Sequence, residues 1–311
     1  MGTTYTVKLA GVPPDRATTA ELRKTVEARL QELNRQMSHH LPHSELSRFN
    51  QSSSTEPFSV STELAHVVRC ALQWARESNG AFDPTIAPLV NLWGFGPRAP
   101  KSRVPTDAEI AAAMRRCGHQ HLRVTSAAQL QKTVPELQLN LGAIGKGFAA
   151  DEIARLLRTR GYTNLFVSVS GEIVTLGRNQ DGRPWRIGIE YPEYGPRRSQ
   201  RLIAIIELSG RAIATSGGTH QFFRDSEGRI YPHVLDPRTG RPVQHRLASV
   251  TVVAPDAISA DAAATILFVL GVKEGLRWLQ SRPQLAALFI VPSDADRFEL
   301  VPSDGFPPFR R

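Results

Sequence analysis

The segment from Leu137 to Leu157 constrains the fold most strongly, and it reads LQLNLGAIGKGFAADEIARLL. Alternating apolar residues open it, as is typical of a strand, and apolar residues at helical spacing close it. Between them lie three glycines within six residues, Gly142, Gly145 and Gly147. Glycines let a backbone approach a ligand closely, and the free N–H groups of a helix's first turn suit a phosphate. We therefore expect a strand, a glycine turn and a helix, which serve either a polar ligand or only a tight connection.

Length and composition are those of an ordinary globular protein. The 311 residues are 41% hydrophobic and 22% charged, which allows one large domain or two closely joined subdomains with ample core. No apolar run approaches the roughly 20 residues of a membrane span. The first residues, MGTTYTVKLAGV, lack the pattern of a secretory signal. These features leave open a cytoplasmic protein or a mature form whose leader has been removed.

The net charge of +9 favours anionic partners. The lysines and arginines are nevertheless scattered, without long basic runs or interleaved aromatic residues. A nucleic-acid groove is therefore unsupported, and we expect no nucleic-acid partner. An anionic small molecule fits the charge equally well. The two cysteines, Cys70 and Cys117, form no disulfide framework and lack metal-ligand spacing.

Periodicity and capping signals predict further elements along the chain. Thr18 and Thr106 each precede a glutamate by three residues, a capping-box pattern that predicts helices ending near Met37 and Gly118. A further helix is expected over 61–78, and strands over 5–9, 185–191 and 202–208. The strand-like segment 165–177 follows the helix of the glycine segment, so strand, helix and strand predict a parallel or mixed pair.

Three histidines, His39, His40 and His43, cluster within MSHHLPHSELSRFN. Such a cluster suggests a metal site, but Pro42 breaks any helical spacing, and no carboxylate or cysteine completes a ligand set. We therefore predict a polar loop.

Other polar residues stand out within apolar surroundings. Asp83 precedes Pro84 in a stretch rich in glycine and aromatic residues. It is expected to form a turn or helix cap, a polar anchor in a pocket wall, or both. His233 and Asp236 lie on either side of a short apolar pair, before a Pro-Arg-Thr-Gly turn.

Asp261 and Thr265 are four residues apart in a segment that predicts a strand, a Pro-Asp turn and a helix. This spacing places both on one helix face, where a carboxylate and a hydroxyl suit Mg²⁺. The alternative is structural, with Asp261 in the first turn near the positive end of the helix dipole and Thr265 bonded back to its own helix.

Eight segments, in order, carry a resemblance to a known family. They are MGTTY, SELSRFN, GAFDPTIAPLVNLWGFG, LNLGAIGKGFAAD, SGEI, ATSGG, HVLDPRTGRP and SVTVVAPDAISADAAAT. Together they resemble the ApbE family, the FAD:protein FMN transferases, and the resemblance runs from Met1 to about Gly271. One such motif would be weak evidence, whereas eight in register are strong.

The resemblance implies a group transfer from FAD. With Mg²⁺ activating the pyrophosphate, a Ser or Thr hydroxyl of an acceptor protein attacks the FMN-side phosphorus, so that FMN becomes joined by a phosphoester and AMP is released. Two alternatives share the fold: an FAD pyrophosphatase giving FMN and AMP, and a non-catalytic FAD-binding module. Retention of Asp261, Thr265 and His233 argues against the binding module, because a binder needs no metal site.

The resemblance also implies roles for individual residues. The metal ligands would be the backbone carbonyl of Ala143 with Asp261 and Thr265. His233 would handle the acceptor's proton, and Asp236 would orient it or hold the turn. Contacts with FAD would fall on Met1, His40, Ala81, Phe82, Asp83, Asn140, Lys146 and the backbone around Leu235.

Three positions depart from the family pattern. Some relatives have a tyrosine that can stack on the flavin where His40 stands, and often an aspartate where Asn140 stands. Some have a further aspartate at Ala264, so either one metal ligand or one oxygen that supports the ligands would be absent here. Flavin orientation and charge beside the cofactor are therefore expected to differ.

The implied architecture is α+β and T-fold-like, a single transferase domain over residues 1–311. Two closely packed, interleaved subdomains would enclose FAD in a cleft lined by segments 81–83, 140–147 and 233–236. The expected partner is an acceptor protein with a Ser/Thr flavinylation motif. Family members usually carry a leader, often a lipoprotein signal, before the position of Met1. We therefore expect membrane anchoring by a leader absent from this chain, and a periplasmic location or one on the outer face of the cytoplasmic membrane.

Overall fold

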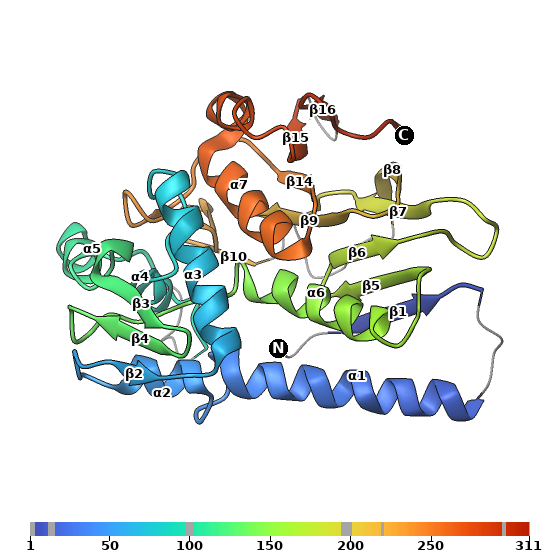
Figure 1. The fold of residues 1–311 in the computed structure, drawn as a ribbon. Helices are drawn as coiled ribbons and strands as arrows, with labels where there is room; N and C mark the ends of the chain where they lie inside the picture. The colour runs from blue at the N-terminus through green and yellow to red at the C-terminus, as the bar shows by residue number, and fades with distance from the viewer. Residues whose placement is uncertain are drawn as a thin grey trace. The chain divides into compact units, whose positions relative to one another are not determined.

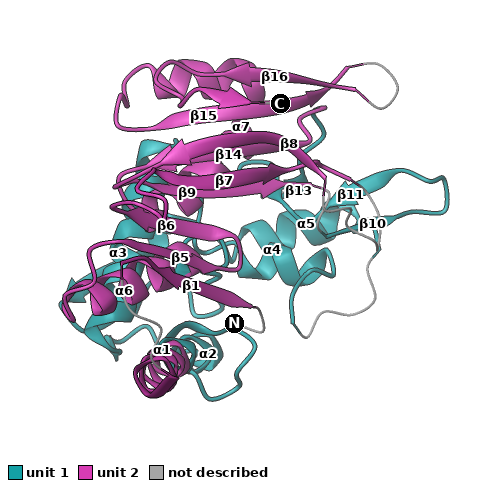
Figure 2. Ribbon diagram, turned by 90° about the vertical axis from the view of Figure 1, so that its right-hand side faces the viewer, with its two compact units in different colours: residues 1, 33–145, 220–245 teal, residues 2–32, 146–219, 246–311 magenta. Residues whose placement is uncertain are grey.

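The computed structural model describes residues 4–11, 16–97, 103–193, 201–218, 221–293 and 297–310 (Figure 1). The chain forms two compact units, each assembled from separate segments (Figure 2). Unit 1 contains residues 1, 33–145 and 220–245, and unit 2 contains residues 2–32, 146–219 and 246–311. Each unit combines helices with antiparallel sheets, which confirms the expected α+β class.

Unit 2 is built on a seven-stranded sheet in the order β1-β5-β6-β9-β14-β15-β16. Its strands are β1 (Tyr5–Leu9), β5 (Leu165–Val169), β6 (Glu172–Leu176), β9 (Ala212–Gly217), β14 (Ser249–Ala254), β15 (Ala286–Pro292) and β16 (Phe298–Pro302). Every pairing in this sheet is antiparallel.

A second sheet of unit 2 packs its apolar side chains onto one face of the first. It contains β7 (Trp185–Glu190), β8 (Leu202–Leu208) and β17 (Phe309–Arg310). Ile187 and Ile206 of this sheet join a buried cluster with Val253 of β14 and Leu288 of β15. Because α7 (Ala257–Leu279) packs on β14 as well, every residue of that strand is buried.

The predicted parallel pair is wrong. Segment 165–176 forms an antiparallel hairpin, β5-β6, whose turn places Ser170 and Gly171 at φ 61° and 103°. The preceding helix, α6 (Gly145–Arg158), has the predicted position but does not connect two neighbouring parallel strands.

No strand forms over Leu137–Leu141, a part of the chain that the structure describes in full. Only one bridge is present there, between Gln138 and Ile86. The carboxamide of Asn50 takes the place of a strand partner: its Oδ1 accepts from the N–H of Leu139 at 2.7 Å, and its Nδ2 donates to the Leu139 carbonyl at 2.9 Å. Because a side chain satisfies these backbone groups, the alternating apolar residues do not need a sheet.

A buried lysine ties the same segment to the end of α2 (Glu45–Gln51). The ammonium of Lys132 donates to the carbonyls of Leu137 at 2.9 Å, Ser52 at 2.6 Å and Phe49 at 3.4 Å. Lys132 is 1% exposed, and burial lowers the pKa of its ammonium to about 8. The cation is tolerated because carbonyl oxygens surround it.

Among its described residues, unit 1 has more helix than strand, and its strands form three small sheets. Its helices are the end of α1 (Arg16–Met37), α2 (Glu45–Gln51), α3 (Thr62–Glu77), α4 (Ala87–Leu92), α5 (Asp107–Met114) and the 3₁₀ turn His119–His121. Its strands are β2 (Phe58–Ser59), β3 (Leu122–Ser126), β4 (Gln129–Lys132), β10 (Phe222–Arg224), β11 (Ile230–Pro232), β12 (Leu235–Asp236) and β13 (Arg241–Pro242). Trp93 anchors a cluster with Leu89, Ile110 and Leu235.

Capping predictions have mixed outcomes. The capping box at Thr106 is confirmed, although α5 ends at Met114 rather than near Gly118. The helix expected over 61–78 is α3, with Ser61 as its N-cap. The capping box at Thr18 is wrong because α1 (Arg16–Met37) already includes that residue.

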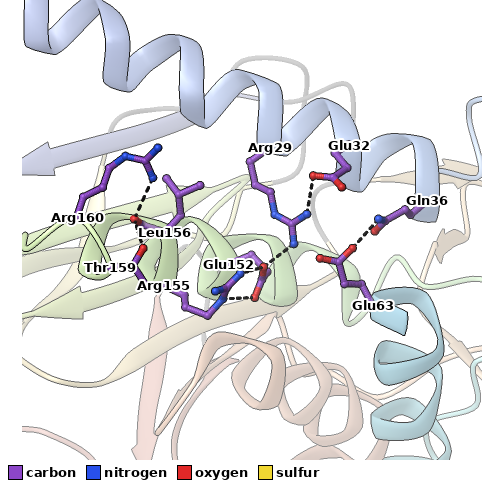
Figure 3. Close-up of polar contacts among 9 residues, drawn as sticks. All are labelled: Arg29, Glu32, Gln36, Glu63, Glu152, Arg155, Leu156, Thr159 and Arg160. Atoms are coloured by element: carbon purple, nitrogen blue, oxygen red, sulfur yellow. Dashed lines mark hydrogen bonds and ion pairs between the residues drawn. The ribbon is translucent and has the colours of Figure 1, made fainter. Parts of the chain in front are cut away.

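Helix α1 is bound to α6 by a charged network. Figure 3 shows Glu152 of α6 between Arg29 of α1, at 2.5 Å, and Arg155 of its own helix, at 2.9 Å. Arg29 also pairs with Glu32 at 2.7 Å.

Among the described helices, none is both long and apolar enough to cross a membrane.

Candidate functional site

Three charged side chains of unit 2 meet at the start of α6. Lys146 is the second residue of that helix, and its Nζ lies 2.9 Å from Asp261 Oδ1 on α7 and 2.8 Å from Glu172 Oε1 on β6. The other oxygen of Asp261 accepts from the backbone N–H of Gly147 at 3.0 Å. One ammonium is thus shared by two buried carboxylates.

Burial and charge act against each other in this cluster. Burial disfavours the charged form of Lys146, but the carboxylates of Asp261 and Glu172 outweigh it, so the pKa of the ammonium is raised. Burial raises the pKa of Glu172 to about 7. The negative charge of Asp261 also raises this pKa, whereas the positive charge of Lys146 lowers it. Lys146 therefore stays cationic at neutral pH and supplies the positive charge of the site.

Close packing between α6 and α7 fixes the position of Asp261. A Cβ on Gly147 would lie 2.1 Å from the Ala257 carbonyl oxygen and 2.9 Å from Asp261 Cβ. Asp151 of α6 accepts the backbone N–H groups of Ala257 and Ile258, each at 2.8 Å. This glycine therefore serves the contact with α7; the sequence left a polar ligand and a tight connection both open.

Asp261 and Thr265 lie one helical turn apart on α7, as predicted. The helix begins at Ala257, so Asp261 is its fifth residue, and the first-turn alternative is wrong. Thr265 Oγ1 lies 3.3 Å from Ser216 Oγ on β9. A buried carboxylate that already attracts a cation, with a hydroxyl one turn away, is a donor set that fits Mg²⁺. Ala143, the third expected ligand, belongs to unit 1 and precedes α6 by two residues.

Asp83 organises a turn in unit 1. Its Oδ1 accepts from the N–H and hydroxyl of Thr85 at 2.8 and 2.6 Å, and its Oδ2 from the N–H and ring Nδ1 of His119 at 2.9 and 3.2 Å. The turn interpretation is therefore confirmed. Sequence reasoning missed His119, because nothing in the sequence indicates that a residue 36 positions away reaches Asp83. The neighbouring Ala81 and Phe82 are buried.

Asn140 lies at the turn that leads into α6. Its Oδ1 accepts from the N–H of Gly142 at 2.8 Å, and its own N–H donates to the Pro84 carbonyl at 2.8 Å. Segments 81–83 and 140–142, both expected to contact FAD, are therefore joined within unit 1.

His233 is oriented by a backbone carbonyl. Its ring Nδ1 lies 3.0 Å from the Gln221 oxygen, and its ring meets Phe95 edge-on at 6.3 Å. Because a carbonyl can only accept, this contact places a proton on Nδ1, so that Nε2 has the lone pair when the ring is neutral. Asp236 binds Arg238 through both carboxylate oxygens, at 2.9 and 2.8 Å. This pairing favours the turn-holding alternative for Asp236.

The remaining residues that were expected to contact FAD have different environments. His40 is exposed, 4.2 Å from the ring of His39, and burial with the charge of His40 lowers the pKa of His39 to about 4. Leu235 is buried in the Trp93 cluster. Met1 lies outside the described residues. Among the residues described, no three His, Cys, Asp or Glu side chains gather as a metal site.

Comparison with known proteins identifies relatives over the whole chain. The sequence model of the ApbE family matches residues 1–289. A Vibrio cholerae protein named FAD:protein FMN transferase is 42% identical over 309 residues, which cover 99% of this chain and 90% of that protein. A Salmonella typhimurium protein of the same name is 38% identical, covering 99% and 87%.

Solved structures agree with this assignment. The flavin transferase ApbE from Vibrio cholerae has a TM-score of 0.86 and 42% identity, with 98% of this chain and 95% of that one covered. The apo flavinyl transferase ApbE of Pseudomonas stutzeri has a TM-score of 0.85 and 37% identity, covering 98% and 92%. The chain therefore belongs to the ApbE family.

Proposed function

We propose that this protein is a Mg²⁺-dependent FAD:protein FMN transferase. It transfers FMN from FAD to a Ser or Thr hydroxyl of an acceptor protein through a phosphoester bond and releases AMP. Its relatives over nearly the full chain carry this enzyme name. The observation that carries the proposal is the buried Asp261 carboxylate, paired with Lys146 and one turn from the Thr265 hydroxyl.

Asp261 and Thr265 would hold the metal ion through hard oxygen ligands. When bound, Mg²⁺ neutralises the charge that builds on phosphate oxygens during transfer. Lys146 adds a fixed positive charge beside them, which favours the pyrophosphate of FAD. The close contact of Gly147 with α7 keeps the Asp261 carboxylate from moving as charge develops.

His233 is the candidate general base. With Nδ1 bound to the Gln221 carbonyl, Nε2 can take the proton of the acceptor hydroxyl as its oxygen bonds to the FMN-side phosphorus. The bond from that phosphorus to the bridging oxygen breaks, and AMP leaves with the electron pair. The arrangement of Asp236 with Arg238 supports a rigid turn beside this histidine.

Two substitutions test these roles. Asp261→Asn should lose Mg²⁺-dependent transfer, followed by flavin fluorescence of the acceptor on a denaturing gel, while its melting curve persists. Asp256→Asn is the matched control, because Asp256 caps the same helix and asparagine caps equally well. Normal turnover by Asp261→Asn would reject the metal assignment.

His233→Ala should reduce transfer more than FAD binding, measured by flavin fluorescence quenching. A loss of FAD affinity alone would show that His233 is not the base. Free FMN and AMP without a labelled acceptor would instead identify a pyrophosphatase.

The proposed location is the periplasm or the outer face of the cytoplasmic membrane, with anchoring by a leader. It is supported only by the family resemblance. Fractionation of cells that produce the protein from its natural gene, with a blot of each fraction, tests it; recovery only from the cytoplasm would reject it.

A further inference from the structure

Glu172 is a buried acid that sequence reasoning left without a role. It lies in the SGEI segment at the start of β6, and its side chain is 5% exposed. Its Oε1 accepts from Lys146, whereas Oε2 is buried and has no hydrogen-bond partner among the described residues. An unpaired buried carboxylate oxygen is costly, so Glu172 calls for an explanation.

The charges around Lys146 do not balance. One ammonium lies within 2.9 Å of two carboxylates whose side chains are 5% and 4% exposed. Lys146 itself is 30% exposed. A single cation cannot compensate two ionised buried carboxylates, and the cluster therefore favours a further positive charge, which a proton or a metal ion can supply.

A metal ion on Asp261 would compete with Lys146. Asp261 Oδ2 accepts a hydrogen bond from the neutral N–H of Gly147, and Oδ1 accepts one from the Lys146 ammonium. A metal ion bound to Oδ1 would therefore lie beside the ammonium, and the two cations would repel each other. Glu172 offers the ammonium a second partner at 2.8 Å, which it can keep when Asp261 is occupied.

We propose that Glu172 is a positioning residue that retains Lys146 when Mg²⁺ takes over Asp261, so that the ammonium does not hold the metal's carboxylate. Lys146 is then a substitute cation for Asp261 in the metal-free protein. This inference rests on the proposed Mg²⁺ site. It predicts that loss of the Lys146 charge strengthens Mg²⁺ binding and that loss of the Glu172 charge weakens it.

The test is calorimetric titration of Mg²⁺ into the full chain without FAD. Lys146→Met removes the competing cation and should tighten Mg²⁺ binding about tenfold, a coupling of about 1.4 kcal/mol. Glu172→Gln leaves the ammonium only Asp261 and should weaken binding about tenfold. If Lys146→Met does not fold, Lys146→Gln keeps a hydrogen-bond donor without the charge and serves the same purpose.

The double variant separates an action through Lys146 from a direct effect of charge. In the Lys146→Met background, Glu172→Gln should weaken Mg²⁺ binding much less than in the wild type. Equal weakening in both backgrounds would show that Glu172 acts by its own charge and would overturn the proposal. Unchanged or weaker binding by both uncharged variants of Lys146 would also overturn it.

Glu152→Gln is the matched control. Glu152 is on the same helix, six residues beyond Lys146, is 13% exposed and is paired with Arg29 and Arg155 (Figure 3). Its substitution removes a largely buried carboxylate charge without touching Lys146, so Mg²⁺ affinity should not change. Asp261→Asn tests the proposed metal site separately from the roles of Lys146 and Glu172.

If Asp261→Asn binds Mg²⁺ as tightly as the wild type does, the proposed metal site is wrong. If Asp261→Asn weakens Mg²⁺ binding but the Lys146 and Glu172 variants bind Mg²⁺ as the wild type does, this inference alone is wrong.

Discussion

Two glycines of the same motif should respond differently to substitution by alanine. A Cβ on Gly147 would lie 2.1 Å from the Ala257 carbonyl oxygen and 2.6 Å from its carbon, whereas the nearest atom to a Cβ on Gly145 is Leu141 Cβ at 3.8 Å. Ordinary contact begins at 3.4 Å. Gly147→Ala must therefore displace backbone at the start of α7, and Gly145→Ala displaces nothing.

The cost of Gly147→Ala follows from two terms. Overpacking against backbone costs about 1–3 kcal/mol. The displacement also breaks the bond from the Gly147 N–H to the Asp261 carboxylate, and a bond to a charged group contributes about 1.5–3 kcal/mol. Alanine returns up to about 1 kcal/mol through its helix propensity. The net loss is about 1.5–6 kcal/mol, which lowers the melting temperature by about 2–9 °C, because a chain of this length has an unfolding entropy of about 0.65 kcal/mol/K.

Differential scanning calorimetry of both variants provides the measurement. Gly145→Ala should melt within about 2 °C of the wild type, since the added Cβ meets no atom closer than 3.8 Å and overpacks nothing. A Gly147→Ala variant that melts with the wild type would refute the packing argument. It would leave a ligand contact as the reason for this glycine.

Two further changes test other buried groups. Lys132→Met leaves buried carbonyls without their donor and should lower the free energy of unfolding by about 3 kcal/mol in urea titration; an unchanged midpoint would contradict this role. Burial raises the pKa of Asp151 from 3.8 to about 7, against the lowering effect of its two backbone hydrogen bonds. The stability from this group is therefore complete below pH 3.8 and is lost as pH rises through about 7. Asp151→Asn should flatten the decline of unfolding free energy over this interval, and parallel profiles for variant and wild type would count against it.

Local signals predicted local structure well. The helix after the glycines, the capping box at Thr106 and the shared face of Asp261 and Thr265 all depend on residues within a few positions of one another. Such patterns are decided by backbone geometry, which the sequence encodes directly.

Long-range partners could not be predicted. The alternation over Leu137–Leu141 is that of a strand, yet Asn50, almost 90 residues earlier, supplies the hydrogen bonds. The antiparallel order of the main sheet also depends on pairings between distant segments, such as β1 with β5.

The candidate site shows the same division. The motifs indicated Lys146 and Asp261 separately, but their ion pair and the buried Glu172 beside them appear only in the fold. In the same way, His119 reaches Asp83 across 36 residues. Charge clusters of this kind are formed by tertiary structure and leave no spacing signal in a single sequence.

The central claim is most directly tested by the intact mass of an acceptor protein. A short protein with the family's Ser/Thr acceptor motif would be incubated with the full chain, FAD and Mg²⁺. The account predicts that the acceptor gains the mass of one FMN, that AMP appears in equal amount, and that a chelator abolishes both. An unmodified acceptor would contradict it: free FMN with AMP would then indicate a pyrophosphatase, and intact FAD a binding protein.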